Sequence, residues 1–75
     1  MFGKKDMHNK YYRLGRRIQW LRQKRGVTQE QLASSVKVSV THLGLVETGS
    51  RKPSLDLVFR IADYLEVKVE DIFKF

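Results

Sequence analysis

The sequence predicts an all-α domain built from five short helices. Apolar residues recur at intervals of three and four in successive segments, which is the spacing of a packed helix face. Serine, threonine, glycine or proline marks most of the boundaries between these segments. With 75 residues and no cysteine, the chain forms one small domain without disulfides or a thiolate metal site. Its net stability is expected to be roughly 3–5 kcal/mol.

Positive charge is concentrated towards the N-terminal end of the chain. The net charge is +7, and residues 1–25 carry nine Lys or Arg against a single Asp. Residues 53–75 carry three basic and five acidic residues, so that end is weakly negative. This asymmetry favours a surface for nucleic acid over the alternative of a solubilising tail and a solvated helix face.

The first helix is predicted over residues 11–25, and Gly26 ends it. Its buried stripe consists of apolar residues spaced by three and four: Tyr11, Leu14, Ile18 and Leu21. Residues 1–10 have no such periodicity and carry three lysines. They are therefore expected to form a flexible basic arm before a domain that spans residues 11–75.

Two short helices follow at the centre of the chain. Thr28 is a good N-cap for the first of them, and Gln31 can complete a capping box. Ser39 offers an N-cap for the second, which is expected over residues 39–47. Gly49 suits the left-handed residue that often ends a helix.

The helix expected over residues 39–47 has two different faces. At roughly 100° per residue, one side carries His42, Leu43, Val46 and Glu47. The other side carries Val40, Thr41, Gly44, Leu45 and Thr48. No long side chain on that second side keeps another surface away. A short helix of this kind in a small basic protein is suited to enter a DNA groove.

A loop and two more helices complete the chain. Pro53 cannot occupy a helix interior, Ser54 is the next N-cap, and Asp56 is well placed against the helix dipole. The apolar face of the fourth helix is expected to consist of Leu55, Val58, Ile61, Ala62 and Leu65. A final short helix is expected over residues 69–73.

The central helices carry an ordered set of residues: Thr28-Gln29-Glu30-Gln31-Leu32-Ala33, Val38-Ser39, Leu43, Val46-Glu47 and Gly49. The flanking helices add Leu14, Ile18, Leu21 and Arg22 before this set, and Pro53-Ser54-Leu55, Ile61-Ala62, Leu65, Val67 and Asp71-Ile72-Phe73 after it. Together these segments resemble the helix-turn-helix domain of the phage repressor and Cro family, also called the XRE family. The match covers about residues 12–73, in the right order and at the right spacing.

The resemblance implies a compact five-helix, lambda-repressor-like DNA-binding domain with its helix-turn-helix at the second and third helices. The third helix would lie in the major groove, and the second would cross the DNA backbone. Contacts to base edges are then expected from Val40, Thr41, Gly44 and Leu45.

The resemblance also implies phosphate contacts and an internal ion pair. Gln29 opens the second helix and would hold a phosphate, helped by the amides at that helix N-terminus. The residues expected at phosphates are Thr28, Gln29, Lys37, Ser39, Arg51 and Lys52. Arg22 and Glu47 match a salt bridge that ties the first helix to the third, and losing one partner would leave a partly buried charge unpaired.

The chain departs from the family pattern at several positions. Lys37 and Glu66 stand in turns where the family commonly has glycine, so these residues are expected at positive φ. Val40 and Leu45 cannot make the bidentate hydrogen bonds that read purines, although they can pack on thymine methyl groups. Modest specificity and a large phosphate contribution are therefore expected.

Together these features predict a sequence-specific double-stranded DNA-binding transcriptional regulator of the repressor type. It would bind a near-palindrome as a homodimer, with the C-terminal apolar cluster as the dimer surface: Phe59, Val69, Phe73 and Phe75. The alternative is a protein-binding module that keeps the fold, such as an antitoxin or an anti-repressor. In that case Val40, Gly44 and Leu45 would contact a protein.

Other functions are not supported by the sequence. An enzyme is not expected, because there is no Gly-rich phosphate loop and no carboxylate pair backed by a pocket. No cofactor, metal or small-molecule ligand is expected either. No apolar run approaches the roughly 20 residues needed to span a bilayer, and no signal-peptide core follows the basic N-terminus. The expected location is the cytoplasm.

Overall fold

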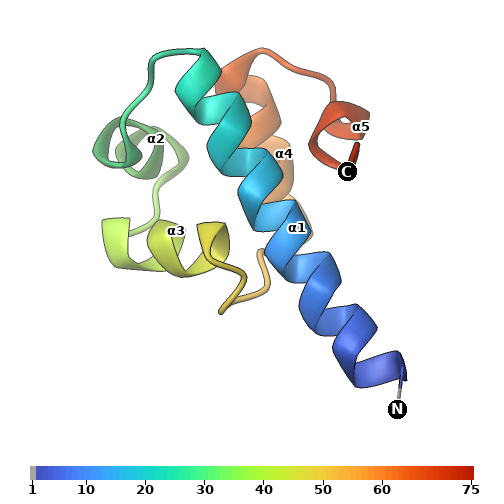
Figure 1. The fold of residues 1–75 in the computed structure, drawn as a ribbon. Coiled ribbons are helices and arrows are strands. Elements are labelled where there is room, and N and C mark those ends of the chain that lie inside the picture. Colours follow the sequence, from blue (N-terminus) through green and yellow to red (C-terminus); the bar gives the residue numbers. More distant parts are fainter. Residues whose placement is uncertain (1) are drawn as a thin grey trace.

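The computed structural model describes the backbone of residues 2–75 and the side chains of residues 10–75. Over that part of the chain the secondary structure is entirely helical, which confirms the all-α prediction (Figure 1). The helices are α1 (Phe2–Lys24), α2 (Gln29–Val36), α3 (Val40–Glu47), α4 (Leu55–Leu65) and α5 (Val69–Ile72). The N-terminal turns of α1 project beyond the other four helices in Figure 1.

Helix α1 begins at Phe2 rather than near Tyr11. Residues 2–10, expected as a flexible arm, continue the helix across the boundary predicted at residue 11. The stretch contains no proline, and adding a residue to an existing helix costs far less than starting a new one. Met1 and the side chains of Lys4 and Lys5 lie outside the described residues.

A single hydrophobic core joins all five helices. Its buried members are Leu14, Ile18, Leu21, Leu32, Ala33, Val36, Leu43, Val46, Leu57, Val58, Ile61, Ala62, Leu65 and Ile72. The predicted stripe of α1 is confirmed for Leu14, Ile18 and Leu21, while Tyr11 is partly buried against the core. The core therefore sets how α3 is held against α1 and α2.

The predicted apolar face of α4 was wrong at one position. Leu55 is 64% exposed, whereas Leu57, which had not been assigned to that face, is 1% exposed. Leu55 precedes Leu57 by two residues, or roughly 200° around the helix, so the two side chains point to opposite sides. The buried face is centred on Ile61, which lies one helical turn after Leu57.

Side-chain caps start three of the helices as expected. The Thr28 hydroxyl accepts from the Gln31 N–H at 3.0 Å, and the Gln31 carboxamide oxygen accepts from the Thr28 N–H at 2.9 Å, which completes the capping box. Ser39 accepts from the His42 N–H at 2.9 Å to start α3. The Ser54 hydroxyl accepts from the Leu57 N–H at 3.0 Å to start α4.

Asp71 holds the first turn of α5. A hydrogen bond from the Lys74 side chain, and then one from the Lys68 N–H, lowers the pKa of its carboxyl group below the usual value. Because the folded-state pKa is lowered, this contribution to stability is present above the unfolded-state pKa. It is lost as the pH falls through the lowered value.

Arginine side chains satisfy the carbonyl groups at several helix ends. Arg17 Nε donates to the Asp71 carbonyl at 2.8 Å, and Arg25 Nη1 donates to the Leu65 carbonyl at 2.7 Å. Arg60 Nη1 donates to the carbonyl of Val36 at 2.6 Å. Arg17 and Arg25 belong to the basic stretch that was expected to face nucleic acid. In the fold, their side chains instead join α1 to α5 and to the end of α4.

Both residues expected at positive φ are found there. Lys37 has φ 64° after α2, and Glu66 has φ 58° after α4. At Lys37 the N–H of Val38 reaches back to the Ala33 carbonyl at 3.0 Å, which closes the helix end as a Schellman motif does. The turn between α2 and α3 thus keeps its shape with a strained lysine in place of glycine.

Lys37→Gly is expected to raise the free energy of unfolding by about 0.5–1 kcal/mol. The left-handed conformation costs a non-glycine residue roughly 1–2 kcal/mol, and the extra chain entropy of glycine offsets about 0.5–1 of that. Thermal unfolding followed by circular dichroism measures the change. Lys37→Ala is the control, since it removes the charge and keeps the Cβ. An equal gain in both variants would show that charge, not backbone strain, is responsible.

Candidate nucleic-acid interface

Helix α3 is anchored on one face and exposed on the other. Leu43, Val46 and Glu47 are at most 1% exposed, while Val40 is 40% and Leu45 38% exposed. Thr41 and the partly exposed Gly44 complete the exposed side within α3, which we call the reading face, and Thr48, also expected on that side, caps the end of the helix. This division agrees with the faces predicted from the helical wheel. Contact of the reading face with base edges stays a prediction.

Helix α1 crosses α3 so closely that only glycine fits at the crossing. A Cβ atom on Gly15 would lie 2.3 Å from the Val46 carbonyl oxygen and 2.6 Å from that of Glu47. Beyond the end of α3, Gly49 has φ 81°, and a Cβ there would lie 2.6 Å from the Tyr12 Cα. Two glycines therefore bring the backbone of α1 against the C-terminal end of α3.

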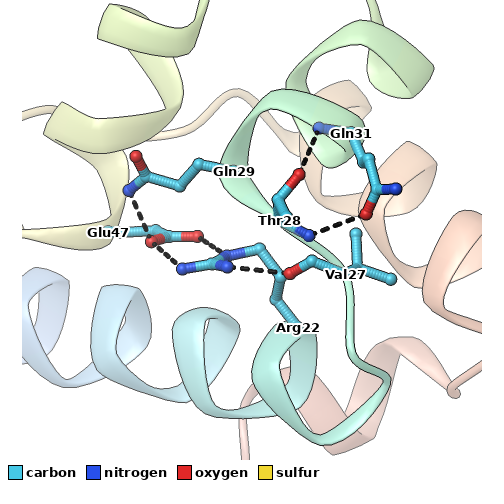
Figure 2. A network of polar contacts seen from close by, with 6 residues as sticks. All are labelled: Arg22, Val27, Thr28, Gln29, Gln31 and Glu47. Carbon is cyan, nitrogen blue, oxygen red and sulfur yellow. Dashed lines mark hydrogen bonds and ion pairs between the residues drawn. The ribbon is translucent and has the colours of Figure 1, made fainter.

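A buried ion pair also joins α1 to α3 (Figure 2). Arg22 Nε donates to Glu47 Oε2 at 2.7 Å, and Arg22 Nη2 donates to Glu47 Oε1 at 3.1 Å. The two side chains are 9% and 1% exposed. Arg22 Nη1 also donates to the Val27 carbonyl at 2.8 Å, so each guanidinium nitrogen has an acceptor. The pair therefore forms a bidentate, charge-assisted contact in a site that is almost fully buried.

Gln29 joins this ion pair from the start of α2. Its Nε2 donates to Glu47 Oε1 at 2.9 Å (Figure 2). Gln29 was expected at a phosphate, and the local sequence carries no signal for this bond. One of the two amide hydrogens is therefore committed within the protein. Any contact of Gln29 with DNA has to use the rest of the amide.

The other residues expected at phosphates lie at the start of α2 and on either side of α3 along the chain. Thr28 and Ser39 act as N-caps, and their hydroxyl hydrogens are not needed for that role. Lys37 is exposed in the turn before α3, and Arg51 and Lys52 are exposed in the loop after it.

The loop that carries Arg51 and Lys52 is tied to the end of α3. The N–H groups of Ser50 and Arg51 both donate to the Leu45 carbonyl, at 2.9 and 3.1 Å. The Thr48 hydroxyl donates to the same carbonyl at 3.1 Å. The backbone of Arg51 is therefore held at the end of α3, while the Lys52 ammonium lies over the Tyr11 ring of α1, 5.6 Å from its centroid.

The expected dimer surface is exposed at three of its four positions. Phe59, Phe73 and Phe75 are 47, 46 and 43% exposed, whereas Val69 is partly buried against the core. Phe73 and Phe75 line a shallow apolar groove of about 320 Å³ together with residues of α1: Lys10, Tyr11 and Leu14. Helix α1 thus contributes to a surface that was expected from the C-terminal helices alone.

Comparison with known proteins places this architecture in a family. The helix-turn-helix family model matches residues 18–72, which include α2, α3 and the Arg22–Glu47 pair. The chain belongs to the XRE-type helix-turn-helix family. This XRE-type domain is a DNA-binding transcriptional regulator and not an enzyme.

Individual relatives support the same assignment. An uncharacterised HTH-type transcriptional regulator of Methanocaldococcus jannaschii is 40% identical over 57 residues, covering 76% of this chain and 86% of the relative. YazB of Bacillus subtilis, also an uncharacterised HTH-type transcriptional regulator, is 38% identical and covers 77% of this chain and 84% of its own length. The restriction-modification controller protein C.AhdI of Aeromonas hydrophila superposes with a TM-score of 0.81 at 30% identity, covering 84% and 96% of the two chains.

Sequence reasoning missed two features of this XRE-type domain that position α3. One is Gly15, whose only signal was a glycine in the interior of a helix that ought to avoid it. The other is the Gln29–Glu47 bond, which joins residues 18 positions apart and had no local signal. Within residues 2–75, none of the helices is both long and apolar enough to cross a membrane.

Proposed function

We propose that this XRE-type domain is a repressor-type regulator that binds a near-palindromic operator as a homodimer, with α3 in the major groove of each half-site. One observation carries the proposal most directly. The reading face of α3 is exposed and free of long side chains, while the opposite face is anchored by the core and by the Arg22–Glu47 pair. Such a helix can enter a groove without first giving up contacts inside the protein.

Phosphate contacts at both ends of α3 would set its register on DNA. Lys37 and Ser39 precede the helix, and Arg51 and Lys52 follow it. Thr28 adds a hydroxyl beside the free amides at the start of α2. Contacts of this kind orient a protein on the duplex without reading its sequence.

Direct readout would come from the apolar part of the reading face. Val40 and Leu45 offer methyl groups that fit thymine C5-methyl groups, and the Thr41 hydroxyl offers one polar contact. Gly44 brings the helix backbone close to the bases. We therefore expect thymines at the positions of each half-site that Val40 and Leu45 would contact.

The homodimer is supported by the apolar end of the domain. Phe59, Phe73 and Phe75 are each more than 40% exposed, and Phe73 and Phe75 line the apolar groove beside α1, where a second copy could cover them. A two-fold dimer binds half-sites about 34 Å apart, which requires a palindrome. A dimer seated on such an operator represses by excluding other proteins from the same stretch of DNA.

Selection of bound sequences from random duplex DNA at physiological salt tests the proposal. We expect a palindromic motif with thymines in each half-site. A pool without a motif, together with an affinity that does not change with salt, would favour the alternative of a protein-binding module.

Two variants separate base reading from phosphate binding. Leu45→Ala is expected to weaken the preference for thymine by about 0.8 kcal/mol, roughly fourfold, for each buried carbon that it removes. Lys52→Gln is expected to weaken binding to all sequences alike and to reduce the salt slope by about 0.9. Competition binding at several salt concentrations measures both effects. The opposite pattern, with Lys52 altering the motif and Leu45 altering only the salt slope, would refute the assigned roles.

A further inference from the structure

One side of α1 carries a row of cations around an exposed tryptophan. Arg13, Arg17, Trp20 and Lys24 follow one another at intervals of four, three and four residues, so their side chains share one side of the helix. Trp20 is 47% exposed, Arg13 and Lys24 are exposed, and Arg17 is partly buried. We call these four residues the basic stripe. The stripe spans roughly 16 Å along α1, or about three helical turns.

The basic stripe lies on the side of α1 away from α3. Gly15 and Arg22 mark the side of α1 that packs against α3. Trp20 follows Gly15 by five residues and precedes Arg22 by two, which places it roughly 140° and 160° round the helix from them. Both α1 and α3 therefore separate the stripe from the reading face. The proposed contacts to the operator leave the positive charge of the stripe unused.

The cations of the basic stripe rest on aromatic rings. The Arg17 guanidinium carbon lies 4.8 Å from the centre of the Trp20 ring, and the Lys24 ammonium nitrogen lies 4.7 Å from the same centre. The Arg13 guanidinium carbon lies 5.3 Å from the centre of the Phe75 ring. Among residues 10–75, none of these three cations forms an ion pair with a carboxylate. Each of them is therefore available to an acidic partner.

These contacts also order the long side chains before a partner arrives. A free Arg or Lys side chain loses conformational freedom when it is fixed at an interface, which weakens binding. Cation–π attraction to the rings already restricts all three cations. The hydrogen bond from Arg17 Nε to the Asp71 carbonyl, 2.8 Å long, restricts Arg17 further. The stripe is therefore preorganised for binding.

The chemistry of the stripe favours a protein partner over nucleic acid. Trp and Arg are enriched among the residues that dominate binding at protein–protein interfaces. A phosphate backbone would pair with the cations but offers no apolar group to cover the indole. A single-stranded base would have to stack on the Trp20 ring, over which Arg17 and Lys24 already lie. A second copy that met the stripe with its own stripe would bring like charges face to face.

Intervals of three and four residues are those at which a second helix presents its side chains to a helix packed along it. We propose that the basic stripe is a docking surface for an acidic amphipathic helix of a partner protein. Its carboxylates would pair with Arg13, Arg17 and Lys24, and an apolar side chain would cover the exposed part of Trp20. This surface is additional to the proposed DNA-binding and dimer surfaces.

Binding of a labelled synthetic peptide tests the proposal. The probe is a helical peptide of about four turns, with leucine at intervals of three and four residues and glutamate beside each leucine. A control peptide has lysine in place of every glutamate. Fluorescence anisotropy at physiological salt should show binding of the acidic probe alone. Trp20 is the one tryptophan of the chain, so its emission should move to shorter wavelength as the probe covers it.

Variants of the full chain locate the binding site. Trp20→Ala should weaken binding of the acidic probe at least about tenfold, and Lys24→Gln up to about fivefold. Arg51→Gln is the matched control, because it removes a cation from the loop after α3. It should leave probe binding unchanged and weaken DNA binding, whereas Lys24→Gln should do the reverse. If Trp20→Ala does not fold, as circular dichroism would show, the double variant Arg13→Gln with Lys24→Gln takes its place and should lose about tenfold.

Several results would overturn the proposal. Equal losses in Lys24→Gln and Arg51→Gln would mean that the probe responds to net charge alone. A folded Trp20→Ala protein that binds the probe as the unmodified chain does would remove the stripe from the site. Trp20 emission that shifts with duplex DNA instead of the acidic probe, or with protein concentration alone, would assign the stripe to nucleic acid or to a second copy. The selection of operator sequences tests the proposed function separately.

Discussion

Glu47→Ala is expected to leave most of the domain unfolded at physiological temperature. The substitution strands the Arg22 guanidinium, whose side chain is 9% exposed, and removes the acceptor of Gln29. Removing one partner of a buried pair costs about 3–5 kcal/mol, which is comparable to the roughly 3–5 kcal/mol of net stability expected for a domain this small. Urea denaturation followed by circular dichroism measures the loss.

Two controls show whether burial is the cause. Glu66→Ala breaks the Arg25–Glu66 pair, whose side chains are 44% and 73% exposed, and should cost less than about 1 kcal/mol. The double substitution Arg22→Met with Glu47→Leu removes both charges and should restore most of the stability, because no unpaired charge remains. If the double variant is as unstable as Glu47→Ala, an unpaired charge is not the source of the loss.

Gly15→Ala is expected to destabilise the domain by about 1–3 kcal/mol, or more. In an ordinary helix interior the same change would stabilise by about 1 kcal/mol. Here the added Cβ would lie 2.3 Å from the carbonyl oxygen of Val46 and 2.6 Å from that of Glu47. These are backbone atoms, so relief requires α3 to move away from α1. Thermal unfolding measures the change, and a shifted α3 should also weaken DNA binding.

Gly44→Ala is the matched control for stability. Its Cβ would meet one atom at 3.9 Å, an ordinary contact, so the helix should gain up to about 1 kcal/mol. The two glycine variants are therefore expected to change stability in opposite directions. If Gly15→Ala also stabilises, the close crossing of α1 and α3 does not exist in solution.

The Glu47 and Gly15 variants both test what holds α3 in its position. An isolated helix of eight residues is not stable in water, so α3 owes its position to what it packs against. The Gly15 crossing and the Arg22–Glu47 pair act on its C-terminal half, and the core holds Leu43 and Val46. Losing any of these contacts is expected to displace the proposed reading face without altering any of the residues proposed to contact bases.

Much of the fold was predictable from local features. The N-caps Thr28, Ser39 and Ser54 start helices where expected. Lys37 and Glu66 adopt the positive φ that the resemblance to the family implied. Helical spacing also divided α3 correctly into buried and exposed faces. The errors occurred where spacing allows two solutions, as for Leu55 and Leu57 in α4, or where a helix has no marked start, as for residues 2–10.

Periodicity and capping, which act over a few residues, predict the order of the helices, their caps and the exposed side of α3. The family follows from the resemblance of ordered motifs along the chain. Three features became visible once the helices were packed: the arginines that bond to helix-end carbonyls, the need for glycine at residue 15, and the bond between Gln29 and Glu47. Each of those depends on atoms brought together by packing from distant parts of the chain, such as Arg17 and the carbonyl of Asp71, 54 positions apart.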